Sequence, residues 1–389
     1  MSLDLRSHFS IFREAAPKRI HLAAHSHHYW PDVACKAHEQ AMRDAARLAD
    51  RKWDFVFDDL MRRVRRGVAA RLPLPDPATI AFAPNTHELV CRLLSALPLT
   101  HPPRVLTSDA EFHSFERQIA RLAEDGLVTV ERIAAEPAET FAVRFRSAAA
   151  RGDHDLIFLS QVFYNSGATS GDIAALVEAV PGRESFLAID GYHGFMALPT
   201  DLSGVADRIF YLGGGYKYAM AGEGCCFMHC PPAYAPRPRD TGWFAGFGAL
   251  TSGVSDEVAY AADGSRFLGA TFDPSGLYRL AAVFAWMDEI GLTVPAIHAH
   301  VLALQEAFLR GAEAIEPLRR ARLVTPIGRA ERGHFLCYET PAAPSLHAQL
   351  AQAGIVTDVR GSRIRFGFGC YHTEQDIEEA IGVMVKTLH

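Results

Sequence analysis

The stretch "FLAID" at residues 186–190 and the stretch "RIFYLGGGYKYAMAGEGCCFMHC" at residues 208–230 decide the fold. Both begin as short apolar runs without polar alternation, which is typical of parallel strands buried on both faces. The second run stops at three glycines, which let the chain turn sharply, and Lys217 follows between Tyr216 and Tyr218. We therefore expect Lys217 to leave the sheet and to point into a cleft.

Similar apolar runs on either side of this stretch predict a larger sheet. They alternate with segments whose apolar residues recur at helical spacing, the pattern of an α/β sheet flanked by helices. We expect a large domain with a mainly parallel seven-stranded sheet. Its strands are expected at residues 79–84, 104–109, 128–133, 156–162, 186–190, 208–213 and 224–229.

The last third of the chain predicts a smaller α+β domain, in which a long helix precedes short apolar runs and two further helices. We expect an N-terminal segment at 1–50 that lines the site and packs on the small domain. The large domain is expected at 51–285 and the small one at 286–389. Residues 231–253 are rich in proline and glycine, and this connection is long for a compact domain. We expect it to be functional or to pack on a partner.

Composition argues against several classes of function. The chain has 389 residues and a net charge of −6, which provides no broadly basic surface for nucleic acid or for a membrane. It has no apolar window of membrane-spanning length and no apolar core of a signal peptide near its start. The seven cysteines are scattered and odd in number, as in a reduced protein with buried thiols. We expect a cytoplasmic protein without a nucleic-acid or membrane partner.

Two residues at strand ends point to a cofactor. Ligands of open α/β sheets bind at the carboxyl ends of the strands. Asp190 ends the fifth predicted strand, and Lys217 follows the sixth. A lysine amine can hold pyridoxal phosphate covalently, and a carboxylate can keep its pyridine nitrogen protonated so that the ring takes up electrons. The pair therefore predicts a pyridoxal 5'-phosphate site.

Five motifs in order resemble the class V aminotransferase group of fold-type I pyridoxal phosphate enzymes, and within it the kynureninases. The resemblance extends over most of the chain. The motifs are "LSQVFYNSG" (159–167), "DGYH" (190–193), "YK" (216–217), "GW" (242–243) and "RIRFGFGCYHTEQDIEEA" (363–380).

The resemblance implies roles for the residues around the cofactor. Lys217 would bind the cofactor and then act as the base that moves protons. Asp190 would pair with the pyridine nitrogen, and His193 would orient Asp190 or the ring substituents. Tyr216 would donate its hydroxyl to the cofactor phosphate. Ser160, at the end of the fourth strand, would also contact the cofactor.

The phosphate end and the open face of the cofactor have further candidates. A helix that begins at Thr86 offers free N–H groups to a phosphate, although Asn85 and Glu88 also have the spacing of a capping box. On the open face, the resemblance implies that Phe112 stacks on the cofactor ring, with His113 as the alternative.

The substrate and the partner have candidates too. Arg365 would bind the substrate α-carboxylate in two-pronged fashion, with Arg363 and Arg360 as its competitors on the same stretch. Trp243 would contact the phosphate region from the opposite subunit, because active sites of this group lie at a homodimer interface. The segment "HLAAHSHHYWP" (21–31) would line the site entrance. Its histidines lack partners at ligand spacing, so we expect no metal.

Departures from the kynureninase pattern bear on the substrate. "FAGFGAL" after Gly-Trp lacks the expected histidine, and "ARLADRKWDFVFDD" matches poorly. Asp273 stands where an asparagine is expected to recognise the aromatic end of the substrate. An amide exchanged for a carboxylate changes which ring substituents a pocket accepts. The resemblance therefore predicts the cofactor site of this chain more fully than it predicts specificity for kynurenine.

These observations predict a pyridoxal phosphate enzyme that acts on an L-amino acid. The first reading is a kynureninase-like hydrolase, which cleaves a Cβ–Cγ bond to give an anthranilate-type product and alanine. The alternative is a class V aminotransferase that passes the amino group to a keto acid. A cysteine desulfurase or lyase is disfavoured, because no cysteine precedes Arg365 in its loop and Cys370 follows it. A non-catalytic cofactor binder would not need Lys217, Asp190 and Arg365 together.

Overall fold

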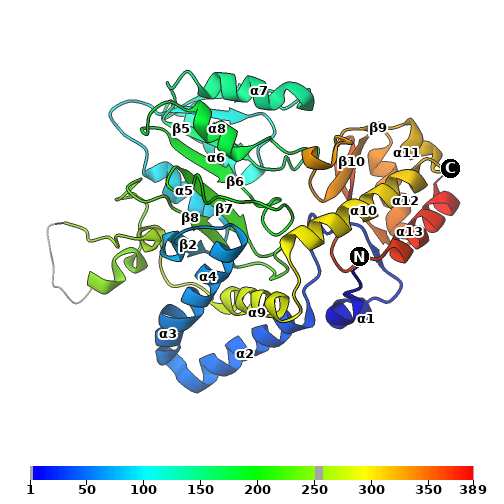
Figure 1. The fold of residues 1–389 in the computed structure, drawn as a ribbon, viewed down its shortest axis with the longest axis horizontal. Coiled ribbons are helices and arrows are strands. Elements are labelled where there is room, and N and C mark those ends of the chain that lie inside the picture. Colours follow the sequence, from blue (N-terminus) through cyan, green and yellow to red (C-terminus); the bar gives the residue numbers. More distant parts are fainter. Residues whose placement is uncertain (1–2, 250–256, 389) are drawn as a thin grey trace.

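The computed structural model describes residues 3–249 and 257–388, and a large sheet lies at its centre (Figure 1). Within these residues the sheet has seven strands in the order β2-β8-β7-β6-β5-β3-β4. Strand β8 runs in the opposite direction to the other six strands, which all point the same way, so the prediction of a mainly parallel sheet is confirmed. The strands are β2 (Ile80–Ala83), β3 (Arg104–Ser108), β4 (Thr129–Ile133), β5 (Leu156–Ser160), β6 (Phe186–Asp190), β7 (Ile209–Gly214) and β8 (Cys226–His229).

Burial explains which strands lack polar alternation. Every residue of β5 and β7 is buried, as expected for inner strands covered on both faces. The edge strand β4 is partly exposed and carries Glu131 and Arg132. The helices that flank this sheet are α4 (Met61–Arg71), α5 (Thr86–Ser95), α6 (His113–Glu124), α7 (Ala138–Ala149), α8 (Ile173–Ala179) and α9 (Ser275–Glu289).

The register of the inner strands places the predicted residues at one edge of the sheet. Ser160, the last residue of β5, pairs with Asp190, the last residue of β6. Asp190 in turn pairs with Leu212 of β7, and Lys217 is the third residue after the end of β7. These carboxyl ends therefore meet where ligands of open α/β sheets bind.

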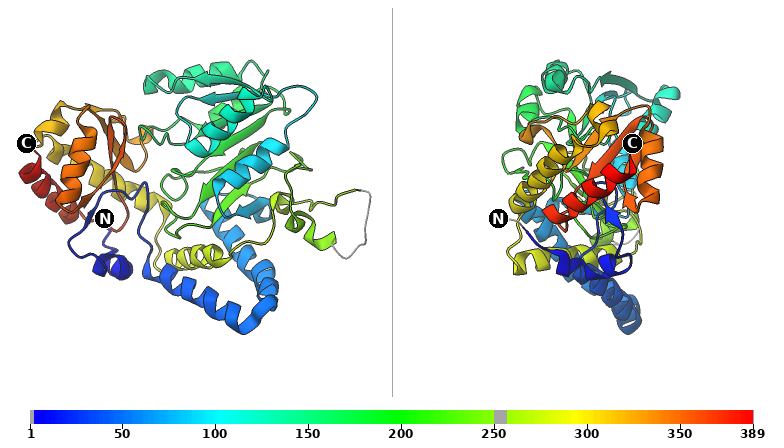
Figure 2. Two further views of the ribbon diagram at one scale, coloured as in Figure 1. Left: turned by 180° about the vertical axis from the view of Figure 1, so that it is seen from behind. Right: turned by 90° about the vertical axis from the view of Figure 1, so that its right-hand side faces the viewer.

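A smaller unit follows α9 in the chain. Within the described residues its sheet is antiparallel and four-stranded, in the order β12-β13-β10-β9. Figure 2 shows this unit at one end of the molecule, beside the large sheet and close to both chain ends. Its elements are α10 (Val294–Ala312), α11 (Glu316–Arg320), β9 (Arg322–Leu323), β10 (Phe335–Glu339), α12 (Ala343–Gln352), β12 (Asp358–Arg360), β13 (Arg363–Gly367) and α13 (Glu374–Thr387).

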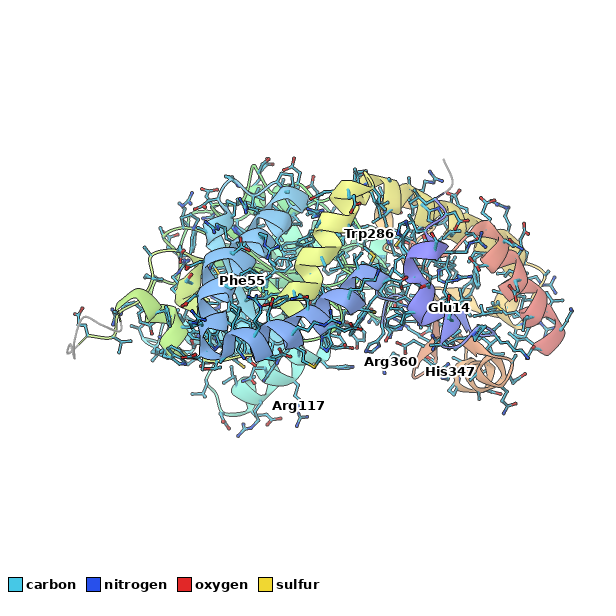
Figure 3. The ribbon with its side chains drawn as sticks, turned by 90° about the horizontal axis from the view of Figure 1, so that it is seen from below. Glu14, Phe55, Arg117, Trp286, His347 and Arg360 are labelled. Carbon is cyan, nitrogen blue, oxygen red and sulfur yellow. The ribbon has the colours of Figure 1, made fainter. Side chains whose placement is uncertain are left out.

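The N-terminal segment contacts both parts of the molecule. Strand β1 (Ile20–His21) pairs in parallel with β11 (Ile355–Val356) of the smaller unit. Helix α2 (Asp32–Leu48) packs along α9, and Figure 3 shows the two side by side, with Trp286 labelled on α9. The boundaries expected at residues 50 and 285 stay a prediction. The other short elements are η1 (Arg6–Phe9), α1 (Ser10–Glu14), η2 (Ala49–Arg51), α3 (Lys52–Phe55), η3 (Val56–Leu60), η4 (Pro77–Thr79), η5 (Trp243–Ala249), η6 (Gly264–Phe267) and η7 (Arg329–Glu331).

Two further findings concern expectations from the sequence. In the part of the chain that is described, no single helix is long and apolar enough to cross a membrane, and α9 with α10 reaches that length only as a pair bent by 87°. The proline- and glycine-rich segment 231–253 runs past the sheet into η5, but residues 250–253 lie outside the described residues.

Candidate active site

The turn after β7 brings Lys217 into the protein interior. The Lys217 side chain is buried, and its Nζ lies 2.9 Å from Nε2 of His193. Three aromatic rings surround the amine, with Nζ 4.9 Å from the Tyr192 centroid, 5.3 Å from that of Phe112 and 5.7 Å from that of Tyr216. Burial lowers the pKa of Lys217 to about 7, partly opposed by the negative charge of Asp190. A substantial fraction of this amine is therefore uncharged near neutral pH, as a nucleophile requires.

Gly222 lies in the loop that follows Lys217 in the chain. Its φ is +68°, a conformation that L side chains rarely adopt, and a Cβ at this position would lie 2.0 Å from the ring of Trp30. Glycine is therefore required both by the backbone and by the tryptophan packed against it.

Asp190 is a buried carboxyl group at the end of β6. Its Oδ1 accepts a hydrogen bond from the backbone N–H of Tyr192 at 2.9 Å. Burial raises the pKa of Asp190, and this hydrogen bond and the charge of Lys217 oppose the rise. A protonated ring nitrogen placed here would supply the opposite charge that a buried carboxylate needs.

His193 is held in its neutral form. Burial is the main cause that lowers its pKa well below the ordinary value, and the charges of Lys217 and Arg365 act in the same direction. A neutral imidazole can donate one hydrogen bond and accept another, so it can orient the Lys217 amine without adding charge.

A pocket of about 240 Å³ joins these groups to the start of helix α5. The side chain of Asn85 caps this helix by accepting from the N–H of Glu88 at 3.0 Å, so the capping interpretation of Asn85 is observed. Thr86 begins the helix, at the positive end of its dipole. Eight predicted site residues line the pocket: Asn85, Thr86, Phe112, Ser160, Asp190, His193, Tyr216 and Lys217.

The structure separates the two aromatic candidates for the open face of the cofactor. Phe112 lines the pocket and lies beside the Lys217 amine. His113 is exposed, as the first residue of α6. Stacking on the cofactor stays a prediction, and the geometry favours Phe112 for it.

The three arginines of the terminal stretch have different surroundings. Arg365 is buried, and its guanidinium donates to the carboxylate of Asp358 and to the backbone carbonyl of Tyr164. Arg363 is bound by Glu136 and Glu339. The side chain of Arg360 is 52% exposed. Tyr164 lines the pocket, which places Arg365 directly behind the pocket wall.

Two predicted site residues lie away from the pocket in this chain. The carboxylate of Asp273 accepts from the N–H of Ser275 at 2.9 Å and from its hydroxyl at 2.8 Å, so it holds the start of α9. Trp243 is 45% exposed and contacts Phe244 and Phe247. Neither lines the pocket. The roles expected for them in substrate and cofactor binding stay predictions.

Sequence reasoning did not select several residues that the structure brings to the site. Tyr192 and Cys226 line the pocket, and the Tyr192 hydroxyl lies 3.4 Å from the Cys226 sulfur. Glu111 is buried beside the pocket and accepts from the Ser160 N–H at 2.9 Å and from the Ser160 hydroxyl at 2.5 Å. Burial raises the pKa of Glu111 to about 8, although these hydrogen bonds act in the opposite direction.

Asp358 was also not predicted as a site residue, although the sequence contains a signal for it. Gly361 and Ser362 form a two-residue connection between β12 and β13, and φ of Gly361 is +56°. Such a connection fixes the register of a hairpin. Counting outward from it places Asp358 opposite Arg365, as observed.

Pyridoxal 5'-phosphate fits the residues present. The buried carboxyl of Asp190 lies in the same pocket as the buried amine of Lys217, and the amino end of α5 opens onto that pocket. These are the groups needed for a protonated ring nitrogen, an aldehyde and a phosphate. The described residues hold no cluster of three or more His, Cys, Asp or Glu side chains suited to a metal ion.

Comparisons with known proteins agree with this chemistry. Residues 297–384 match the family model of the kynureninase C-terminal domain. The chain is 28% identical to the kynureninase of Deinococcus radiodurans over 336 residues, which cover 82% of this chain and 79% of that protein. It is 30% identical to the isopenicillin N epimerase of Streptomyces clavuligerus over 213 residues, half of each protein.

A solved structure supports the fold. A lysine-to-alanine variant of C-DES, with glycine covalently linked to its pyridoxal phosphate cofactor, superposes with a TM-score of 0.81. The superposition covers 99% of this chain and 100% of that one at 17% sequence identity, so this likeness concerns the fold.

The chain has the fold of fold-type I pyridoxal phosphate enzymes, and its site and its matches are similar to those of their class V aminotransferase group. Within that group the chain is similar to kynureninase, and its cofactor is pyridoxal 5'-phosphate.

Proposed function

We propose that this protein is a kynureninase-like hydrolase. It would cleave the Cβ–Cγ bond of a kynurenine-type L-amino acid to give an anthranilate-type product and alanine. The observation that carries the proposal is the buried Lys217 amine, 2.9 Å from His193 and in one pocket with Asp190, in a chain similar to kynureninase.

The residues of the pocket divide the work of holding the cofactor. Lys217 would hold it covalently through Nζ, Asp190 would pair with its ring nitrogen, and Phe112 would cover one face of the ring. Thr86 and Tyr216 would bind its phosphate, at the start of α5 and beside the lysine, and Ser160 would contact its ring edge. When bound, the cofactor supplies a ring that takes up the electrons of the substrate bond being broken.

Lys217 and His193 are suited to the proton transfers. The pKa of Lys217 is about 7, so its Nζ can both take up and release a proton near neutral pH. Neutral His193, 2.9 Å away, would hold Nζ in the orientation needed for transfer at the substrate α-carbon. Arg365 would bind the substrate α-carboxylate.

A class V aminotransferase is the second candidate. The position of Asp273 favours it, because this residue binds Ser275 at the start of α9 and does not line the pocket. Within one chain, Asp273 is therefore engaged at the start of α9 and not in the pocket. The same Lys217, Asp190 and Arg365 would serve amino transfer to a keto acid.

The cysteines argue against a desulfurase reaction. Such a reaction needs an accessible thiolate, which requires a pKa near or below neutral. Burial raises the pKa of Cys226, which lines the pocket, to about 11, and that of the buried Cys370 to about 12. The described residues therefore offer no pocket thiol suited to a desulfurase reaction.

We also propose a cellular location and an oligomeric state for the protein. The seven cysteines are all free, which supports a reducing compartment such as the cytoplasm. We expect a homodimer, supported by the exposed aromatic side chains of Trp243 and Phe247. Sedimentation of the wild type and of a Trp243→Ala, Phe247→Ala variant tests it, with the variant expected to dissociate at higher protein concentrations.

The reaction is tested by mixing the holoprotein in single turnover with L-kynurenine and with 3-hydroxykynurenine. Release of alanine and an anthranilate, with the original cofactor absorbance restored, is the expected result. Conversion of the cofactor to its pyridoxamine form would identify the aminotransferase instead. Absence of any spectral change with both substrates would contradict the hydrolase.

A further inference from the structure

The carboxylate of Asp358 lies directly beside the Arg365 guanidinium. Asp358 of β12 lies directly opposite Arg365 of β13 in an antiparallel pair, so the two side chains share one face of the small sheet. The Arg365 guanidinium donates one N–H to Oδ2 of Asp358 and another, from its second terminal nitrogen, to the Tyr164 carbonyl. The side chains of Arg365 and Asp358 are only 4% and 11% exposed.

The remaining edge of the guanidinium is free. The Nε atom of Arg365 is buried and has no hydrogen-bond partner among the described residues. A guanidinium carries five N–H donors in a rigid plane, and buried donors are nearly always satisfied. Because both terminal nitrogens are held, the plane is fixed, and the edge that contains Nε is left for an incoming acceptor. A carboxylate binds such an edge through two parallel hydrogen bonds.

The surroundings keep the Asp358 carboxylate in place. Oδ2 of Asp358 lies 3.8 Å from Nε2 of His25, whose fully buried ring stacks on Phe335 at 4.6 Å. The Arg365 guanidinium lies 5.7 Å from the centroid of the same Phe335 ring. Burial lowers the pKa of His25 well below its ordinary value, and Arg365 acts in the same direction. The neutral imidazole therefore leaves the negative charge of Asp358 to two arginines, Arg365 and the half-exposed Arg360, whose Nε lies 3.7 Å from Oδ1.

We propose that Asp358 is the positioning residue of the substrate-carboxylate subsite. It neutralises the buried guanidinium when no substrate is present, and it turns the Nε edge of Arg365 toward the α-carboxylate of the amino acid. The inference rests on the proposed function only in taking an amino acid as the ligand of Arg365, and it is independent of which bond is then cleaved.

The test compares two small ligands of the holoprotein, L-alanine and L-alaninamide, which differ only in the carboxylate. Their dissociation constants are measured by titrating the cofactor absorbance of the wild type and of Asp358→Asn. The variant keeps the shape of the side chain and removes its charge. We expect L-alanine to bind about tenfold more weakly to the variant, which corresponds to about 1.4 kcal/mol, and L-alaninamide to bind equally well to both proteins.

The matched control is Glu339→Gln. Glu339 of β10 lies opposite Arg363 of β13 in the same kind of cross-strand ion pair. Arg363 donates to the carbonyl of Asn165, which does not line the pocket, whereas Arg365 donates to that of Tyr164, which does. This variant should leave the L-alanine to L-alaninamide ratio unchanged, which separates carboxylate recognition from the stability of the small sheet.

Three outcomes would overturn the proposal. Tighter L-alanine binding by Asp358→Asn would mean that Asp358 competes with the substrate for Arg365. Equal weakening of both ligands would indicate a merely structural role. If the wild type binds both ligands equally well, or binds neither, Arg365 does not bind the substrate carboxylate. Because no product is measured, each outcome is distinct from failure of the proposed hydrolysis.

Discussion

The amine of Lys217 and the imidazole of His193 form a buried pair, with Nζ 2.9 Å from Nε2. Burial lowers the pKa of both groups, and the charge of Lys217 lowers the pKa of His193 further. The lysine is therefore kept close to the point at which it loses its proton, while the histidine stays neutral beside it. A neutral amine and a neutral imidazole can form a hydrogen bond without placing an unpaired charge in the interior.

Replacing Lys217 by alanine should abolish the covalent attachment of the cofactor and reduce turnover by several orders of magnitude. Lysine is the only group with a nucleophilic amine in the described pocket lining. Borohydride treatment of the wild-type holoprotein should add the mass of the reduced cofactor to the peptide that contains Lys217. The exposed Lys386→Ala is the control and should retain labelling and activity. Wild-type turnover in Lys217→Ala with unchanged folding would refute the assignment.

Replacing Asp190 by asparagine should shift the titration of Lys217 to lower pH. Burial lowers the pKa of Lys217 to about 7, and the Asp190 carboxylate opposes this by favouring the charged amine. Loss of that carboxylate leaves burial unopposed, so the neutral amine persists to more acidic pH. The rate at which the apoprotein takes up pyridoxal phosphate, followed against pH, should rise with a midpoint of about 7 in the wild type and at lower pH in the variant. A midpoint that moved to higher pH would show that Asp190 does not act on Lys217.

Much of the fold could be predicted from apolar runs alone, because inner strands such as β5 and β7 are buried on both faces. Strand ends also predicted the meeting of Ser160, Asp190 and Lys217, since register in a parallel sheet brings its carboxyl ends together. The surroundings of Glu111 could not be predicted in the same way. Its burial depends on a loop that folds back onto β5, which no local pattern encodes.

The limits are clearest for residues whose position depends on distant segments. The motif predicts a substrate-binding role for Asp273, and within one chain the structure shows it binding Ser275, two residues further along the chain. The surroundings of Trp243 within one chain leave it exposed, and a motif cannot reveal what covers such a residue. Asp358 was within reach of prediction, because the short Gly361–Ser362 connection fixes its partner across the hairpin.

Replacing Gly222 by alanine should destabilise the fold more than the same change at Gly126. Both glycines have nearly the same positive φ, +68° and +69°, so both variants carry the same backbone strain. Only at Gly222 would the new Cβ meet a neighbour, the Trp30 ring at 2.0 Å, while nothing lies within 4 Å of it at Gly126. Urea unfolding should show about 1–3 kcal/mol of additional destabilisation at Gly222, the usual cost of overpacking. If the two variants lose the same stability, the Trp30 ring moves aside at no measurable cost in free energy.

The stability of the protein should fall as the solution becomes more acidic than about pH 6.5, because several buried histidines are neutral in the folded state. Burial lowers the pKa of His28 to about 3 and that of His229 and of His372 to about 4, against about 6.5 in an unfolded chain. Between about pH 4 and 6.5 the unfolded chain therefore binds protons that the folded state does not, and each such histidine lowers the free energy of unfolding by about 1.4 kcal/mol per pH unit.

The variant His229→Gln isolates one of these contributions. Glutamine can still bond to the Thr79 hydroxyl and to the Ala206 carbonyl, which His229 contacts at 2.8 and 2.7 Å, but it cannot take up a proton at this pH. Denaturant unfolding at about pH 7 and at about pH 5 should show that the variant loses about 2 kcal/mol less stability on acidification than the wild type does. Carboxyl groups act equally in both proteins and cancel in the comparison. If the wild type and the variant lose the same stability on acidification, His229 takes up a proton in the folded protein as readily as in the unfolded chain.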